Sequence, residues 1–332
     1  MAKISSVRFE EALAQTANQK RYLLLGNGFS IAAHAPFAYS SLFEIAVSTD
    51  PTLKPIFERA KTKNFELVIA KTSDLDLKAR VRSALVQAVT DAHPKSSLWL
   101  SNEQKASCAE FLRDFVGLER GDLRGRIYTT NYDLLLYWVV VAHNALLKAY
   151  DGCDTYGVWD EARLHNSQVL YLHGALHLYE RQIGRDGTRE TYKVTYEPGL
   201  PLIDQIKARL RAGEAPLFVS EGDPWHKLEG MRGARYLEKV KQAWSKDCND
   251  EAATIFTIGH SLSTEDKHLT RWIREGRVGS LYVGAFNEGE AEQLRKLTAS
   301  WQHWREAYGR PPLEVSIFLT PECKVWTRTT VP

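Results

Sequence analysis

The sequence predicts an α/β fold built on a doubly wound parallel sheet, and three observations support this. Several short segments are continuously apolar, as strands are when helices cover both faces of a parallel sheet. Helical patterns separate most of them, and this alternation is typical of a doubly wound domain. Most of the segments also end in Gly, Thr or His. The expected strands are residues 22–25, 126–129, 168–172, 253–258, 280–284 and 314–319.

Three helices are expected directly after strands, over residues 30–47, 264–275 and 288–308. Ser263 is expected to cap the second of these helices. Asp266 would then stand at its third position, a pattern similar to a capping box.

Two stretches interrupt the alternation and predict helical insertions or lids. Residues 51–121 carry apolar residues at helical spacing, which indicates a helical insertion. Residues 180–250 are irregular and are expected to form a second insertion, with residues 216–230 either a lid over the site or a packed surface segment. Residues 1–50 and 122–332 would then form the α/β domain, with the second insertion inside it.

Composition and charge narrow the function classes. The 332 residues include 43 basic and 41 acidic side chains, and a net charge of +2 gives no strong attraction to nucleic acid or anionic membranes. No window approaches the ~20 apolar residues of a membrane helix, and the N-terminus lacks a secretory apolar region. The four cysteines, at 108, 153, 248 and 323, are far apart, so a zinc ribbon is not supported and a reduced, cytoplasmic protein is expected.

The glycine turn after the first expected strand is a candidate phosphate site. In RYLLLGNGFSIAA, Gly26 and Gly28 permit close approach of a ligand, and Ser30 adds a hydroxyl donor at the start of a helix. The GxGxxG fingerprint is incomplete, because Ala32 or Ala33 falls where its last glycine would stand. A plain strand-to-helix turn explains this motif equally well.

Polar residues at three further strand ends favour a ligand site. Because the carboxyl ends of parallel strands share one edge, these residues are expected to lie near the glycine turn. Capping a helix needs one polar side chain, whereas TTNYD supplies four. The residues are Thr129, Thr130, Asn131 and Asp133 after the second strand, His173 and Gly174 after the third, and Gly259, Ser261 and Ser263 after the fourth.

The motifs GNGFS, TTNYD, LHG and GHSLS, in this order, resemble those of sirtuin-type proteins. More closely, the chain resembles the bacterial SIR2-like group that includes the DUF4917 proteins. This resemblance covers most of the chain and implies a Rossmann-like domain that binds NAD. It further implies an NADase that cuts the nicotinamide–ribose bond and, in several bacterial relatives of anti-phage defence, hydrolyses cellular NAD.

The resemblance also implies roles for individual residues. Asn131 would orient the nicotinamide ribose and the attacking water, Asp133 would contact the carboxamide, and His173 would act as general base. Gly26, Gly28 and Ser30 would hold the pyrophosphate, while Gly259, Ser261 and Asn287 would meet the adenosine. The full cofactor-binding set expected is Gly26, Asn27, Gly28, Phe29, Ser30, Thr130, Gly174, Gly259, Ser261 and Asn287.

The sequence departs from sirtuins at three points and leaves several functions open. Asn27 replaces a small residue in the turn, the four-cysteine zinc module is missing, and a helical insert replaces the cofactor loop. These departures disfavour protein deacetylation. An NAD or ADP-ribose sensor without turnover and an ADP-ribosyltransferase stay open as alternatives, as does a homo-oligomer or a defence-system partner protein. No metal is expected, because His165, His173 and His177 have no clear carboxylate or cysteine partner, and a metal-dependent hydrolase is the most distant alternative.

Overall fold

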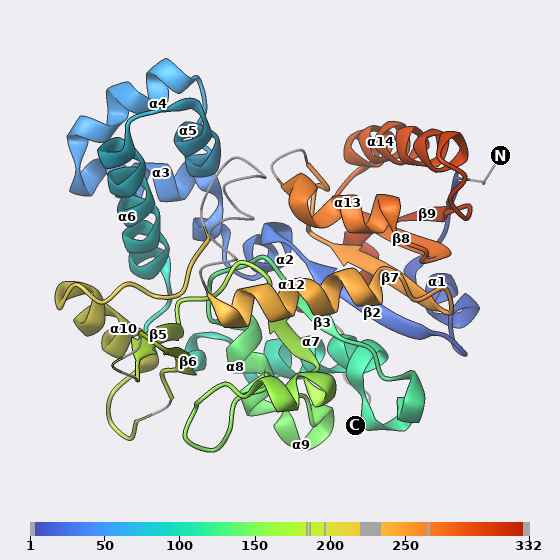
Figure 1. Ribbon diagram of the computed structural model, residues 1–332, viewed down its shortest axis with the longest axis horizontal. Helices are drawn as coiled ribbons and strands as arrows, with labels where there is room; N and C mark the ends of the chain where they lie inside the picture. Colours follow the sequence, from blue (N-terminus) through green and yellow to red (C-terminus); the bar gives the residue numbers. More distant parts are fainter. Residues whose placement is uncertain are drawn as a thin grey trace.

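The computed structural model describes residues 4–183, 185, 187–195, 197–219, 234–263 and 266–327. Within these residues, seven parallel strands form the central sheet, in the order β1-β9-β8-β7-β2-β3-β4 (Figure 1). The predicted doubly wound parallel sheet is therefore confirmed. The strands are β1 (Ile4–Ser6), β2 (Lys20–Leu25), β3 (Ile127–Thr129), β4 (Val169–Tyr171), β7 (Ala253–Ile258), β8 (Ser280–Ala285) and β9 (Glu314–Leu319).

The order of the strands places a switch point between β2 and β7. From β2 the chain runs outward through β3 to β4, then returns to β7 on the other side of β2 and continues to β8 and β9. The loops after β2 and β7 therefore diverge to opposite faces of the sheet. In open parallel sheets, ligands bind outside the carboxyl ends of the strands at such a point.

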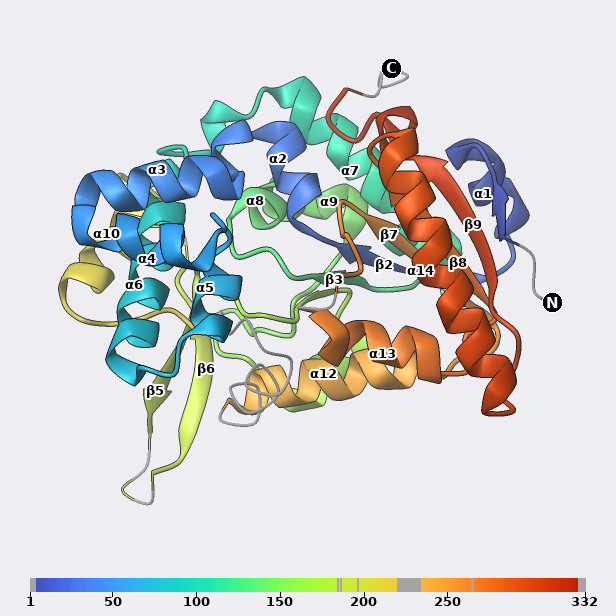
Figure 2. The ribbon, with the colours of Figure 1, turned by 90° about the horizontal axis from the view of Figure 1, so that it is seen from above.

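Helices cover both faces of this sheet (Figure 2). One face carries α1 (Phe9–Gln15), α2 (Asn27–Ala33), α7 (Asn102–Val116), α8 (Leu135–Ala142) and α9 (Asn144–Leu147), and the other carries α12 (Arg235–Asp247), α13 (Lys267–Glu275) and α14 (Glu288–Ala307). On the face that carries α1 and α7, the Phe9 ring contacts Phe111 and Phe256 at centroid distances of 5.8 and 6.3 Å. Aromatic side chains therefore fill the space between these helices and β7. This double cover explains why the strands are apolar without alternation.

A cluster of helices stands beside the sheet and includes much of the predicted helical stretch. It comprises α3 (Tyr39–Thr49), α4 (Lys54–Ala60), α5 (Phe65–Lys71) and α6 (Leu75–Ala92), which pack on one another (Figure 1). The cluster thus starts before residue 51 and ends before α7, which packs against β2 and β3. The helix expected over 30–47 is broken at Ala35–Phe37, because Pro36 cannot continue the hydrogen-bond ladder of α2.

Three strands escaped prediction because they are short or polar. The edge strand β1 pairs with β9 through only three residues. A separate antiparallel hairpin, β5 (Leu178–Gln182) and β6 (Arg189–Lys193), lies within the stretch expected to be irregular, and α10 (Leu202–Arg211) follows it. Residues 220–233 lie outside the described part of the chain, so the lid expected over 216–230 stays a prediction.

A largely buried ion pair joins the residue before β3 to α12. Arg126 Nη1 donates to both carboxylate oxygens of Asp247 at 3.0 and 2.8 Å. The Tyr128 hydroxyl donates to Asp247 Oδ2 at 2.6 Å. Asp247 is therefore fully engaged on the face of the sheet that carries α12.

We expect Asp247→Ala to lower the free energy of unfolding by up to about 3 kcal/mol, because it leaves the largely buried Arg126 guanidinium without its counter-charge. Urea unfolding at pH 7 measures this loss. The control is Glu292→Ala, since Glu292 pairs with Lys296 on the exposed face of α14 and exposed pairs contribute little. Equal urea midpoints for both variants would contradict the prediction.

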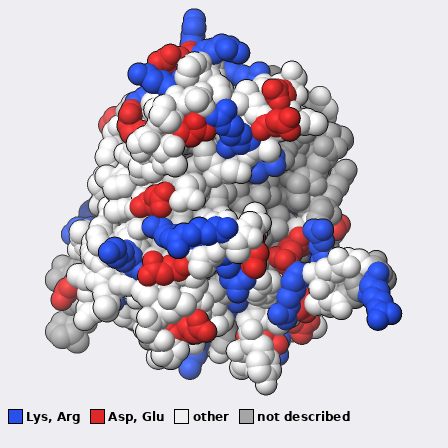
Figure 3. All heavy atoms as spheres, turned by 90° about the vertical axis from the view of Figure 1, so that its left-hand side faces the viewer, with Lys and Arg blue, Asp and Glu red and all other residues white. Residues whose placement is uncertain are grey.

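The surface carries charges of both signs. On the face that includes α4, α6 and α10, Lys and Arg side chains alternate with Asp and Glu (Figure 3). The four cysteines are free thiols, of which Cys108, Cys248 and Cys323 are buried. None of the helices in the described ranges has both the length and the apolar character needed to cross a membrane.

Candidate functional site

A cavity of about 810 Å³ opens where the strands end. Its walls come from the loops after β2, β3, β4 and β7, from α3 and α6, and from the segment around Trp326. Trp326 Nε1 donates to the backbone oxygen of Phe29 at 3.0 Å, which fixes this last segment to α2. The predicted site residues that line the cavity are Gly26, Asn27, Gly28, Phe29, Thr130, Asn131, Asp133, His173, Gly259 and Ser261.

The two glycine turns at the switch point touch each other. The Gly28 N–H donates to the Gly259 oxygen at 2.9 Å, and the Gly26 N–H donates to the Ile258 oxygen at 3.0 Å. A Cβ on Gly26 would lie 2.5 Å from the Gly259 oxygen, so only glycine allows this approach. The N–H groups of Gly26 and Gly28, expected to bind phosphate, are thus engaged with the β7 side, and these glycines act by their small size.

The amide of Asn131 is held by the glycine turn. Its Nδ2 donates to the Gly26 oxygen at 3.0 Å and to Ser30 Oγ at 2.9 Å. The side chain is 7% exposed and lines the cavity. Its buried Oδ1 has no hydrogen-bond partner among the described residues. A fixed acceptor is therefore available to a bound hydroxyl group or water, since a buried oxygen without a partner is costly.

Ser30 and Asp133 form the support behind Asn131. Ser30 is fully buried, does not line the cavity, and donates to Asp133 Oδ2 at 2.6 Å. Asp133 Oδ1 accepts from the Leu135 N–H at 2.8 Å, at the start of α8. Burial raises the pKa of Asp133, while the Ser30 hydrogen bond acts in the opposite direction. The expected pyrophosphate contact of Ser30 is thus replaced by a contact that positions Asn131.

His173 lies at the end of β4 in the cavity wall, with 2% of its surface exposed. Its ring stacks at 6.3 Å from the ring of Tyr132. The sequence predicts that His173 lies at the same edge of the sheet as the glycine turn and Asn131. In the structure, His173 and Asn131 line the same cavity. Gly174 does not line it, because its backbone, at φ +77°, pairs with Phe218 in the next layer.

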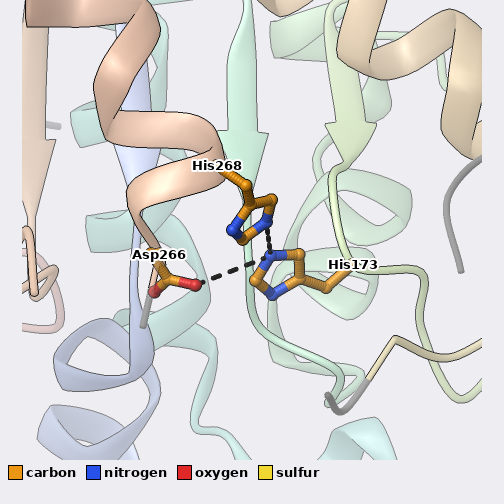
Figure 4. A group of neighbouring side chains, drawn as sticks. All are labelled: His173, Asp266 and His268. Carbon is orange, nitrogen blue, oxygen red and sulfur yellow. Dashed lines mark hydrogen bonds and ion pairs between the residues drawn. The ribbon is translucent and has the colours of Figure 1, made fainter. Parts of the chain in front are cut away.

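Sequence reasoning missed two side chains that contact His173. Its Nε2 lies 2.9 Å from His268 Nε2 and 3.7 Å from Asp266 Oδ1 (Figure 4). Both partners belong to the start of α13, where Asp266 occupies the N-cap position in place of the expected Ser263. The signal was in GHSLSTEDKHL, where two histidines and an aspartate follow a glycine within ten residues. The capping-box pattern had already assigned Asp266 to a structural role.

The other histidines considered with His173 lie elsewhere. His177 is buried between the rings of Tyr137 and Tyr171, at centroid distances of 4.5 and 5.0 Å. His165 is exposed and its Nδ1 bonds to the Ala162 oxygen at 2.7 Å. Neither residue lines the cavity.

The rim of the cavity after β8 also differs from expectation. Asn287 does not line the cavity; its Oδ1 accepts from the Glu290 N–H at 3.0 Å and caps α14. Its neighbours Phe286 and Glu290 line the cavity instead, and Phe286 is 70% exposed. An open aromatic face at this rim suits a planar base.

A buried histidine anchors the loop that carries Asn131. The Leu134 N–H donates to His93 Nε2 at 3.0 Å, and burial lowers the pKa of His93 from 6.5 to about 3. The folded protein therefore keeps this ring neutral at a pH where the unfolded chain protonates it.

We expect the stability contributed at His93 to be lost as pH falls from about 6.5 toward 3. The unfolded state binds the proton in this window and the folded state does not, so the unfolding free energy falls by up to ~1.4 kcal/mol per pH unit. Urea midpoints from pH 7.5 to 4.5 measure the slope. His93→Gln should flatten it, whereas His303→Ala, on the exposed side of α14, should not. An unchanged slope in His93→Gln would contradict the prediction.

The fold and the cavity define a doubly wound α/β protein with a ligand site at its topological switch point. The model of the family described as "Domain of unknown function (DUF4917)" matches residues 23–326, and the chain belongs to this family. None of the curated proteins compared with the chain matches it.

Solved structures similar to the chain include two described as Sir2 proteins. One is described as "Structural Basis for the Mechanism and Regulation of Sir2 Enzymes", at 14% identity and a TM-score of 0.43, covering 95% of this chain and 92% of that chain. The other is described as "Crystal structure of a Sir2 homolog-NAD complex", at 15% identity and a TM-score of 0.43, covering 90% of this chain and 97% of that chain.

Proposed function

We propose that the protein is an NAD⁺ hydrolase that cleaves the nicotinamide–ribose bond to give nicotinamide and ADP-ribose. One observation carries the proposal: the unpartnered Oδ1 of Asn131 and the imidazole of His173 lie in the walls of one cavity at the switch point. Its volume of about 810 Å³ lies within the ~300–1,000 Å³ typical of small-molecule sites. The motif order of the chain, which resembles that of SIR2-like proteins, supports NAD as the ligand.

The reaction needs little acid catalysis, because the leaving group does not have to be protonated. The C–N bond breaks with its electron pair on the pyridine nitrogen, which neutralises the nicotinamide, and the ribose becomes oxocarbenium-like, as in other glycoside cleavages. Water then adds to the ribose carbon and gives up one proton. The protein must position the ribose and the water and accept that proton.

The geometry offers a group for each task. Asn131 Oδ1 would accept a hydrogen bond from the ribose or the water, and the glycine turn and Ser30 hold its amide in place for this. His173 would take the proton. The Asp266 carboxylate, 3.7 Å from its Nε2, would stabilise the resulting imidazolium. We assign the adenosine to the rim with Gly259, Ser261 and Phe286, and the nicotinamide to the end near Asp133.

The test incubates the full chain with NAD in the presence of EDTA, followed by chromatographic separation of products. Equal amounts of nicotinamide and ADP-ribose are expected. Saturable NAD binding without products would replace the proposal with a sensor, and label from NAD on a macromolecule would replace it with a transferase. A role in anti-phage defence and assembly into an oligomer or with a partner protein stay predictions.

A further inference from the structure

The three side chains in Figure 4 form a group that the proposed reaction does not fully use. His173 comes from the end of β4, and Asp266 and His268 come from the start of α13. Their nearest nitrogen and oxygen atoms lie within 4.8 Å of one another, and both histidines are buried. We propose that these three side chains bind one divalent transition-metal ion.

The distances suit a shared ion. A zinc-type ion binds imidazole nitrogen and carboxylate oxygen at ~2.0–2.2 Å, so two donors on one ion lie at most ~4.3 Å apart. The two Nε2 atoms are 2.9 Å apart, and His173 Nε2 is 3.7 Å from Asp266 Oδ1. At these bond lengths the two spacings correspond to ligand–metal–ligand angles of roughly 90° and 120°. Both angles occur in ordinary coordination geometries.

The donor chemistry selects the class of ion. The two Nε2 atoms face each other, so without an ion one ring must donate its N–H to the other, whereas an ion uses both lone pairs. Two imidazoles and a carboxylate suit Zn²⁺, Co²⁺ or Ni²⁺, while Mg²⁺ and Ca²⁺ prefer oxygen ligands throughout. Three protein ligands leave at least one coordination position for water or a further ligand.

A further histidine lies beside the carboxylate. His260 Nδ1 accepts a hydrogen bond from the Leu262 N–H at 3.0 Å, and its Nε2 is on the side of Asp266. That Nε2 lies 3.4 Å from Asp266 Oδ2, which leaves Oδ1 directed to His173. Leu262 has φ +52°, an uncommon conformation for leucine that the surrounding structure must enforce. Asp266 thus has an imidazole beside each of its two carboxylate oxygens.

Metal binding would also regulate the proposed hydrolysis, and this consequence rests on the proposed function. An ion bound to His173 Nε2 would add positive charge to the ring, which disfavours its protonation. The same ion would occupy the Asp266 carboxylate, which could then no longer stabilise a protonated His173. Zn²⁺ should therefore inhibit nicotinamide release, and EDTA should restore it.

The experiment titrates Zn²⁺ into the chelator-stripped full chain by calorimetry, without NAD. One Zn²⁺ per chain is expected, with no comparable binding of Mg²⁺. His268→Gln and Asp266→Asn should each weaken Zn²⁺ binding by about tenfold or more, while the matched control His303→Ala should bind as the unmodified chain does. Thermal unfolding of each variant checks the fold. Asp266 is partly exposed, so Asp266→Asn serves if His268→Gln does not fold.

Two outcomes would overturn the proposal: no Zn²⁺ binding by the folded, unmodified chain, or unchanged affinity in the folded variants. The titration contains no NAD, and the hydrolysis assay contains EDTA. The metal site and the hydrolase can therefore fail independently, and each failure is recognised by its own measurement.

Discussion

We expect His173→Ala to lower the rate of nicotinamide release from NAD by ~10²–10⁴-fold, the range that a positioned general base contributes. Asn131→Ala lowers it by at least ~10²-fold, because a water or ribose displaced by even 1 Å loses about that much. The two expected losses have different origins: in the proposed reaction His173 would accept a proton, whereas Asn131 would supply an acceptor fixed by Gly26 and Ser30. Initial rates measured by chromatography in EDTA quantify both.

The control for this pair is His165→Ala, because His165 is exposed and lies outside the cavity. Its rate should equal that of the unmodified chain. Ser30→Ala tests the support behind Asn131 and should raise KM or lower kcat without changing the pH profile. Full activity in His173→Ala and Asn131→Ala, with intact folds, would refute the assigned roles.

We expect Gly259→Ala to lower the unfolding free energy by more than ~2 kcal/mol and to abolish the proposed NAD binding. The backbone at Gly259 has φ +64°, which costs an alanine ~1–2 kcal/mol. The added Cβ would also lie 2.3 Å from the Phe29 backbone nitrogen, so the two turns at the switch point must separate. Urea unfolding and calorimetric titration with NAD measure the two effects.

Gly309→Ala separates the two causes of this loss. Gly309 has φ +61°, and a Cβ there would meet no atom within 4 Å. It therefore carries the backbone cost alone, and the difference between the two variants reports the clash between the turns. Equal destabilisation, with NAD binding retained in Gly259→Ala, would contradict the prediction.

The sheet could be predicted from the sequence because its strands are covered on both faces and are therefore continuously apolar. The bounds of β7 and β9 agree with the apolar runs expected over 253–258 and 314–319. The hairpin β5–β6 was not readable, since its strands are rich in charged residues such as Arg181 and Glu190, which pair across the strands at the surface. Hydrophobic patterning carries little information about such strands.

The site could be predicted in part, because the topology of a parallel sheet decides where the residues after its strands lie. Residues that follow parallel strands must reach one edge, which brings Asn131 and His173 to the same cavity. The direction in which each side chain points could not be predicted from the sequence. Ser30 points into the protein and Asn287 caps a helix, because tertiary packing decides which partner a short polar side chain finds. The roles of Asp266 and His268 depend on how the start of α13 approaches His173 in the loop after β4, which spacing alone does not reveal.

The contact between Trp326 and Phe29 has a consequence for the timing of biosynthesis. The indole ring seals one wall of the cavity, its centroid 4.9 Å from that of Phe29, although the two residues are separated by almost the whole described chain. While this tryptophan is still in the exit tunnel of the ribosome, the nascent chain already has every candidate catalytic group. The cavity wall that Trp326 completes is still missing. The nascent protein is thus expected to stay inert until translation has passed this point.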